Sequence, residues 1–258
     1  MIKLLRPFED ITSRQSLFII LIWIVAVFAY WWYATSGDIH LFPRPGEIFT
    51  GFKNLYADGL MKHLTHSLLL SGKAILIAML VSLIFAYSST MPVFHPLATT
   101  VSKFRYLPLT GITFYITMIL PNAEDMQIGV LVVFMTTYFV TSLLSMINDI
   151  PQAEFDHARA LKCNRWEVLW EVVIKGRLYE VVDIIRQNLA IAWMMIVTVE
   201  SIRVAGGGLG VLIKNSYRWQ NHGRVIALQI VILLVGLGID FFLNFSRKTL
   251  FPYSQKSH

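Results

Sequence analysis

The chain has 258 residues, of which 55% are hydrophobic and 15% are charged, and its formal net charge is +6. This is more apolar surface than one soluble core needs, so the composition favours a single membrane domain over one or two soluble domains. The single cysteine, Cys163, excludes an intramolecular disulfide framework and a multi-cysteine metal cluster.

Long apolar segments predict the membrane-spanning helices. A helix that rises about 1.5 Å per residue needs roughly 20 residues to cross the hydrocarbon core of a bilayer. Segments 17–33, 66–87, 126–147, 184–202 and 225–245 meet or nearly meet this length. A sixth, 106–121, is short and carries Pro108 near its start, so we expect it to be tilted, kinked or flanked by protein. The sequence therefore predicts an all-α membrane protein of about six transmembrane helices.

The basic residues predict how these helices are oriented. With the N-terminus inside, the inside segments hold thirteen of them: Lys3, Arg6, Arg14, Lys103, Arg105, Arg159, Lys162, Arg165, Lys175, Arg177, Arg247, Lys248 and Lys256. The outside segments hold seven: Arg44, Lys53, Lys62, Arg203, Lys214, Arg218 and Arg224. Because short cytoplasmic loops are enriched in Lys and Arg, both termini are expected in the cytoplasm. Acidic residues before the first apolar run and the lack of a small-residue cleavage site after it favour a retained anchor over a removed signal peptide.

Two segments outside the spans have helical patterns. In 44–62, Ile48, Phe52 and Leu55 recur at helical spacing, which predicts a helix lying in the membrane interface. In 149–183, two apolar stripes flank the break at Lys162-Cys163-Asn164, so we expect two short helices joined by a tight turn. The stripes consist of Phe155, Ala158 and Leu161 before the break, and Trp166, Leu169, Trp170 and Val173 after it. Such an exposed apolar edge needs either a protein partner or the membrane surface to cover it.

The order of residues in this loop resembles a known motif. From Asp156 to Leu161 and from Arg165 to Val173, it is similar to the "EAA" loop of binding-protein-dependent ABC importer permeases. That loop typically runs Glu-Ala-Ala-Arg-x-Leu-Gly and continues with Arg-Trp and Val-x-Leu-Pro. The similarity extends to Ala192-Trp193, to Val199-Glu200, to the glycine run 206–210 with the following 211–213, to 42–45 and to 250–252, in the layout of the nitrate, taurine and alkanesulfonate subgroup.

The loop also departs from the family pattern. Asp156 stands where the family has Glu, His157 where it has Ala, Lys162 where it has Gly, and Lys175 and Tyr179 where prolines are usual. The family glycine is expected to make the turn between the two helices. Because Asn tolerates a left-handed backbone, we expect Asn164 to take that role here. A noncognate or degenerate subunit of a heterodimer is a further interpretation of these departures.

The resemblance implies a type I importer architecture in which this chain carries no ATP chemistry. Two permease copies, as a homodimer or heterodimer, would pair around a pathway in a bacterial inner membrane, with a periplasmic or lipid-anchored binding protein outside. Separate ATPase subunits would hold ATP and Mg²⁺, since this sequence contains no Gly-x-x-x-x-Gly-Lys-Ser/Thr loop. The implied ATPase-coupling residues are Phe155, Asp156, His157, Ala158, Arg159, Ala160, Leu161, Arg165 and Trp166. We expect no cofactor on this chain and no nucleic-acid partner.

Polar residues within the spans are candidates for a substrate pathway because leaving them in lipid is costly. Arg186, Asn188, Thr198 and Glu200 lie on the fifth apolar segment, although Arg186 and Glu200 also suit the two membrane interfaces. The glycine run 206–210 has neither a preceding strand nor a following Lys-Ser, so it predicts a sharp re-entrant turn on the outer side instead of a phosphate loop.

Two other classes of function remain open from the residues alone. A membrane-embedded enzyme would need paired carboxylates or a histidine cluster, and no such set stands out; no catalytic or metal-binding residue is therefore assigned. A stand-alone secondary transporter or channel would favour inverted repeats with matching broken helices, and no clear internal repeat is visible.

Overall fold

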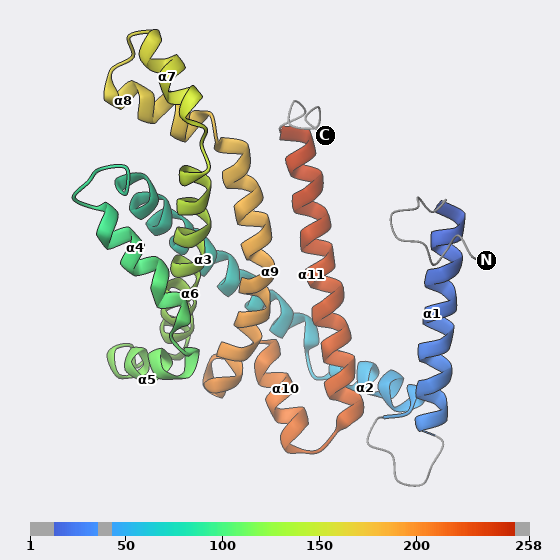
Figure 1. Cartoon of the computed structure of the whole chain (residues 1–258). Helices are drawn as coiled ribbons and strands as arrows, with labels where there is room; N and C mark the ends of the chain where they lie inside the picture. Colours follow the sequence, from blue (N-terminus) through green and yellow to red (C-terminus); the bar gives the residue numbers. More distant parts are fainter. Residues whose placement is uncertain (1–12, 36–42, 251–258) are drawn as a thin grey trace.

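The computed structural model describes residues 13–35 and 43–250, and this part of the chain is helical without strands. The elements in chain order are α1 (Ser13–Ala34), α2 (Pro45–Ala57), α3 (Leu60–Ser88), α4 (His95–Lys103), η2 (Phe104–Tyr106), α5 (Leu109–Ile119), α6 (Ala123–Asn148), α7 (Gln152–Ala160), α8 (Arg165–Val168), η3 (Leu169–Lys175), α9 (Leu178–Ile202), η4 (Val204–Gly206), α10 (Leu209–Arg218) and α11 (His222–Leu250) (Figure 1). The expected all-α membrane architecture is confirmed.

Five described helices are long and apolar enough to cross a membrane: Gln15–Ala34, Leu60–Ser88, Ala123–Asn148, Leu178–Ile202 and His222–Ser246. The sixth expected segment, 106–121, contains the shorter helix α5, which has 11 residues. Pro108 explains the break, since a residue before proline is driven out of the helical region and Leu107 is extended, with ψ 138°. Pro108 itself is the extended N-cap of α5. The described residues thus contain five long apolar helices and one short one.

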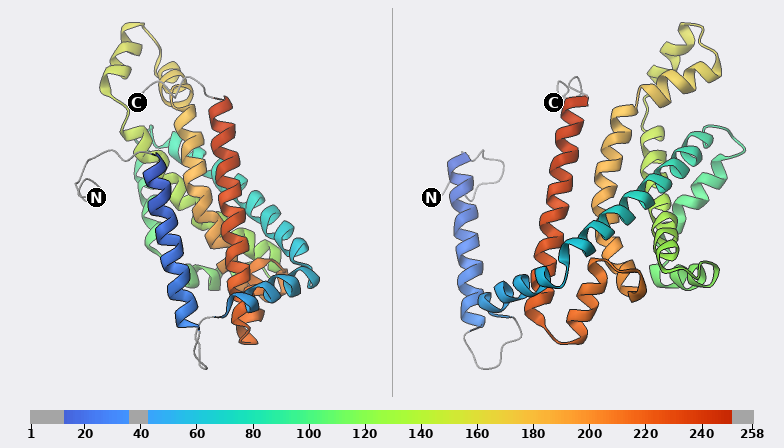
Figure 2. Two further views of the ribbon diagram at one scale, coloured as in Figure 1. Left: turned by 90° about the vertical axis from the view of Figure 1, so that its right-hand side faces the viewer. Right: turned by 180° about the vertical axis from the view of Figure 1, so that it is seen from behind.

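Helix α6 forms the centre of the bundle, with α3 and α9 packed against it (Figure 2). More than half of its apolar window is buried. The side of α3 that is buried carries mostly small residues, which include Ser67, Ser71, Ala74, Ala78, Ser82 and Ala86. Small side chains spaced at three or four residues allow two helices to approach closely, which is how helices associate where lipid removes the hydrophobic drive between them.

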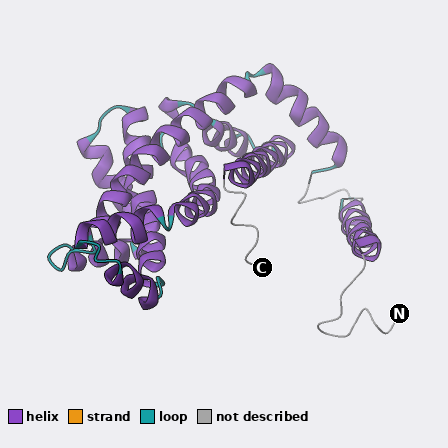
Figure 3. Cartoon of the chain, turned by 90° about the horizontal axis from the view of Figure 1, so that it is seen from above, coloured by secondary structure: helices purple, strands orange, loops and turns teal. Residues whose placement is uncertain are grey.

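The first helix lies apart from this bundle. In Figures 1 and 2, α1 stands beside α11 with a gap between the two ribbons, and most of its side chains are exposed. Trp31, near its C-terminal end, packs against the cluster of buried apolar residues shared by α2, α3, α6, α9, α10 and α11, which we call the main core. Viewed from above, α1 remains at the rim of the arrangement (Figure 3).

Helix α2 forms where 44–62 predicted a helix, and its apolar face packs on the bundle. Ile48 and Leu55 are buried in the main core, and Phe52 packs against it. The helix crosses the start of α11 so closely that a Cβ on Gly51 would lie 2.9 Å from the carbonyl oxygen of Gly223. The apolar face of α2 therefore packs on protein, and the position of the helix in the membrane interface stays a prediction.

Candidate functional site: a projecting hairpin and a glycine turn

The loop 149–183 forms a helical hairpin that projects beyond the bundle. We call residues 151–175 the projecting hairpin; it consists of α7, a turn, α8 and the π-helical segment η3. In Figure 1 it stands at the end of the molecule where α1 begins and α11 ends, while α2, α5 and α10 lie at the other end. The expected pair of short helices joined by a tight turn is present.

The turn of the hairpin is built by Lys162. Its φ is +60°, the N–H of Lys162 donates to the carbonyl of Arg159 (2.9 Å), and the N–H of Cys163 donates to that of Ala158 (3.2 Å). These two bonds are the Schellman pattern that ends many helices, usually with glycine at the left-handed position. Lys162, which stands where the family pattern has glycine, takes this left-handed position.

Asn164 has a different role from the one expected. Its backbone is extended, with φ −67° and ψ 159°, and its side chain accepts a hydrogen bond from the N–H of Arg165 (2.6 Å). Glu167 reaches back to accept the N–H of Asn164 (2.6 Å). The prediction of a left-handed Asn164 is wrong: it is the N-cap of α8, a position that asparagine favours.

Arg177 ties the hairpin to the membrane bundle. Its guanidinium donates to Glu180 on α9 (2.8 Å) and to Glu154 on α7, and its side chain is only 15% exposed. Burial acts to lower the pKa of Arg177, but the bonds and charges of Glu180 and Glu154 outweigh it, so the pKa is raised. The guanidinium therefore stays charged and holds α7 to α9 through charge-assisted bonds.

The nine expected ATPase-coupling residues differ in how exposed they are. Leu161 (67% exposed) and Trp166 (63%) are large apolar side chains open to the surroundings, whereas Ala158 is buried and Phe155 half-buried. His157, Ala160 and Arg165 are exposed. Asp156 and Arg159 form an exposed ion pair with each other at 3.3 Å.

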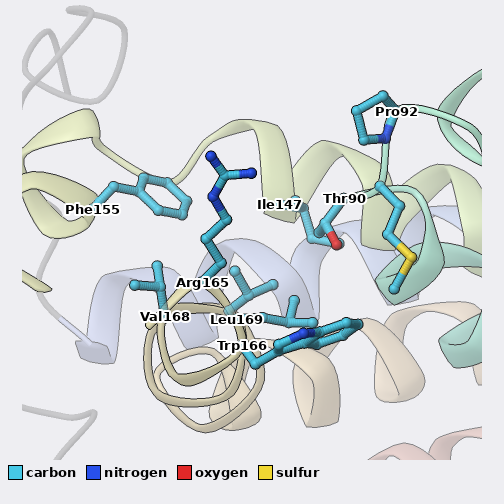
Figure 4. Close-up of a pocket in the computed structure, with 10 residues that line it drawn as sticks. Thr90, Pro92, Ile147, Phe155, Arg165, Trp166, Val168 and Leu169 are labelled. Carbon is cyan, nitrogen blue, oxygen red and sulfur yellow. The ribbon is translucent and has the colours of Figure 1, made fainter. Parts of the chain in front are cut away.

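A cavity of about 570 Å³ lies between the hairpin and the bundle (Figure 4). Phe155, Arg165, Trp166, Val168, Leu169 and Val173 line it from the hairpin, Ile147 from the end of α6, and Thr90, Met91 and Pro92 from the turn after α3. Figure 4 shows Arg165 extended between Phe155 and Ile147.

At the other end of α9, the glycine run forms the sharp turn that was expected. We call residues 206–210 the glycine turn; Gly207 and Gly208 have φ +81° and +106°, a region that disfavours side chains. Each backbone N–H from Gly208 to Gly210 has a side-chain acceptor. Gly208 donates to His63 Nδ1 (3.1 Å), Leu209 to Ser67 Oγ (2.9 Å) and Gly210 to Glu200 Oε2 (2.9 Å).

Glu200 is the centre of this polar cluster and is fully buried. Ser67 Oγ donates to its Oε1 at 2.6 Å, so one carboxylate joins α3, α9 and α10. A Cβ on Gly208 would lie 2.1 Å from the carboxyl carbon of Glu200, and one on Gly206 would lie 2.7 Å from Gln127 Nε2. Glycine is therefore required at 206 and 208 because a side chain would collide with Gln127 and Glu200. The positive φ angles favour glycine at 207 and 208.

The four candidate pathway residues do not come together in one place. Arg186 and Thr198 line a groove of about 610 Å³ between α9 and α11, where Arg186 bonds Asp183 (3.2 Å) and Asp240 (3.1 Å). Asn188 lies on another face of α9, buried against Ser142 of α6 (3.4 Å). Glu200 belongs to the glycine-turn cluster. The groove therefore contains two of the four.

Sequence reasoning missed the partners of these residues. Ser67 and Glu154 were not singled out, since their bonds to Glu200 and Arg177 join positions 133 and 23 residues apart. The one signal in the sequence was that Ser67 belongs to the small-residue spacing of α3. His63 and His66 form no group with a third metal-binding side chain within the described residues.

No family model matches the chain, but several known proteins do. The taurine transport system permease protein TauC of Escherichia coli is 26% identical over 153 residues, or 59% of this chain and 53% of TauC. The nitrate import permease protein NrtB of a Synechocystis species is 23% identical over 172 residues, or 67% of this chain and 60% of NrtB. These matches span between half and two thirds of the relatives' length.

Among solved structures, a chain of an amino acid ABC transporter aligns with a TM-score of 0.63 at 15% identity, covering 75% of this chain and 95% of the other. A chain of the inward-facing MetNI methionine ABC transporter aligns with a TM-score of 0.61 at 15% identity and 74% coverage of this chain. The fold is that of ABC importer transmembrane subunits. The sequence relatives are ABC transporter permeases of the nitrate and taurine type, which confirms the resemblance.

Proposed function

We propose that the chain is the membrane-spanning subunit of an ATP-driven importer and that it couples to a separate ATPase through the projecting hairpin. The observation that carries the proposal is the hairpin itself: it stands beyond the spans with Leu161 67% exposed at its tip. A large apolar side chain in that position suits a groove on a soluble partner protein.

The way the hairpin is built supports a mechanical role. Coupling requires that motion of a bound ATPase reaches the membrane helices, so the element between them must resist bending. The Schellman turn at Lys162, the cap at Asn164 and the Arg177 ion pairs supply that stiffness. Because Arg177 lies directly before α9, force on α7 would reach the helix that holds both the α9–α11 groove and Glu200.

A second permease copy would complete the pathway in this proposal. Arg186 and Asp240 form a charged pair in the α9–α11 groove, and the groove is open along the single chain. A facing copy, identical or related, would close it. The names of the relatives, taurine and nitrate permeases, favour a small substrate that carries a sulfonate or another oxyanion group, with Arg186 and Thr198 contacting the pathway. A binding protein would deliver that substrate in this proposal.

The proposal places the chain in a bacterial inner membrane with both termini cytoplasmic. The end of α11 and the start of α1 lie at the same end of the molecule as the hairpin, which agrees with that orientation (Figure 1). ATP and Mg²⁺ would be held by the partner ATPase subunits.

Native mass spectrometry of the chain purified from its own host tests the coupling. Wild type should carry two ATPase subunits per two permease copies, and Leu161→Asp should lose them. Tyr217→Asp is the matched control, because Tyr217 is 72% exposed on α10 at the opposite end of the molecule. Ala158 is unsuitable for this test since it is buried, and a charge there would disturb the hairpin itself.

Retention of the ATPase by Leu161→Asp at the wild-type level would exclude the hairpin tip as the coupling surface. Absence of an ATPase from wild type would instead favour a stand-alone transporter.

A further inference from the structure

The cavity beneath the projecting hairpin has the composition of a site for an amphiphile. Six of its lining residues are aliphatic, methionine or proline, and Phe155 and Trp166 are aromatic. Thr90 and Arg165 supply the polar atoms. A lining of this kind suits a ligand with a hydrocarbon portion and one anionic group.

Arg165 is the cation of this cavity, and it is available for a ligand. It makes no ion pair with any side chain in the described ranges 13–35 and 43–250, and it is exposed. Its nearest acidic neighbour on the helix, Glu167, accepts the backbone N–H of Asn164 at 2.6 Å. A guanidinium presents a planar fork of donors that matches phosphate oxygens.

The cavity lies at the level where the membrane-spanning helices end. Its walls come from the turn that follows α3, from the end of α6 and from the hairpin before α9. Beside the cavity-lining Pro92, Val93 is 81% exposed and Phe94 44% exposed, which places apolar side chains where lipid would cover them. Trp166 (63%) and Trp170 (53%) are exposed on the hairpin side, and tryptophan is enriched where hydrocarbon meets headgroups.

We propose that this cavity binds one anionic phospholipid of the leaflet that faces the hairpin, with its phosphate against Arg165 and an acyl chain against Met91, Ile147 and Leu169. Basic pockets at the cytoplasmic ends of membrane helices are typical sites for anionic headgroups. The bound lipid would fill the space between hairpin and bundle, so that the two move as one body. This inference goes beyond the proposed function and does not depend on the identity of any ATPase.

The test is native mass spectrometry of the full chain, with whatever subunits it retains, after exchange into defined lipid. The probes are phosphatidylglycerol, phosphatidylcholine of the same acyl composition, and inorganic phosphate alone. We expect wild type to retain phosphatidylglycerol over phosphatidylcholine by about fivefold, the contribution of one basic residue near a membrane. Arg165→Gln should remove that preference, whereas Arg218→Gln, an exposed cation on α10, should keep it.

Equal retention of the two lipids by wild type, or an unchanged preference in Arg165→Gln, would overturn the proposal. Retention of inorganic phosphate with no preference between the lipids would also overturn it, because the site would then be an anion site without an acyl portion.

A second measurement places the acyl chain and does not depend on a core substitution. Phosphatidylglycerol with brominated acyl chains quenches nearby tryptophan, and the contribution of Trp166 is the difference between the parent and Trp166→Phe. We expect that contribution to be quenched more by brominated phosphatidylglycerol than by brominated phosphatidylcholine, and Arg165→Gln to abolish the difference. Equal quenching by both lipids in the parent would contradict a headgroup-selected site. ATPase content measured in the same samples separates this result from failure of the coupling proposal.

Discussion

The glycine turn and the projecting hairpin are attached to opposite ends of α9, and they are held in place by different means. The glycine turn depends on His63 and Ser67 from α3, on Gln127 from α6 and on the buried Glu200. The hairpin relies mainly on its own residues, through the Schellman turn and the Asn164 cap, with Arg177 as its tether. A substitution in the glycine turn should therefore disturb the whole bundle, whereas a substitution in the projecting hairpin should act locally.

The largest effect is expected for Gly208→Ala. The new Cβ would lie 2.1 Å from the carboxyl carbon of Glu200 at a φ of +106°, so both sterics and backbone strain oppose it. We expect a loss of about 3 kcal/mol or more, seen as a lower apparent Tm of the purified chain in a single detergent.

Gly59→Ala is the matched control, because Gly59 also has a positive φ (+83°) but a methyl group added there would have open space within 4 Å. It should cost about 1 kcal/mol from conformation alone. Equal losses of stability in the two variants would show that the contact with Glu200 adds nothing to the cost of the substitution. The glycine turn would then not depend on contacts across the bundle.

The next largest effect is expected for Ser67→Ala. It removes the donor to Glu200 and the acceptor of the Leu209 N–H, both buried, which should cost about 2 kcal/mol of stability. Ser71→Ala provides the comparison one turn along α3, since Ser71 is buried but bonds only the carbonyl of Leu68 in its own helix. An apparent Tm for Ser67→Ala that matches Ser71→Ala would remove the case for a polar cluster that joins three helices.

A smaller and more local effect is expected for Arg177→Gln. The ion pairs to Glu154 and Glu180 are partly screened, with Glu154 44% exposed, so the expected loss is about 1 kcal/mol. Hydrogen exchange should speed up about fivefold in α7 while protection in α6 is unchanged. Faster exchange throughout α6 would show that the hairpin is not a locally stabilised unit.

The smallest effect is expected for Arg159→Ala. Its partner Asp156 and Arg159 itself are 62% and 66% exposed, and exposed pairs of this kind contribute little. Exchange rates in α7 should match wild type. A slowing or acceleration as large as that of Arg177→Gln would mean that Asp156–Arg159 has a structural role in the hairpin.

Much of the fold could be predicted because its determinants are local. Apolar runs of sufficient length predict spans by themselves, and Pro108 indicated that 106–121 would be irregular. The break between α7 and α8 was visible at 162–164, but the residue with the left-handed backbone was not. Propensity favoured Asn164, whereas capping of α8 places Asn164 at the N-cap and leaves the left-handed position to Lys162.

The candidate site was less predictable, because its residues meet across the bundle. The sequence singled out Glu200 and the glycine run separately. The small-residue spacing of α3 indicated only that Ser67 lies at a helix interface, and it did not indicate that Ser67 and His63 complete the cluster. Likewise, Arg186 and Asn188 are two positions apart on one helix and so point in different directions, toward α11 and α6 respectively.

By itself, the sequence determined that the protein is helical, where its long apolar helices lie, and that a helical hairpin interrupts them, since each of these follows from periodicity and composition over neighbouring residues. Only the tertiary structure decided that Glu200 is a buried junction of three helices, that the apolar face of α2 packs on α11, and that Arg165 lies at an apolar cavity. Each of these depends on contacts between residues far apart in the chain, and such contacts are set by how the helices pack.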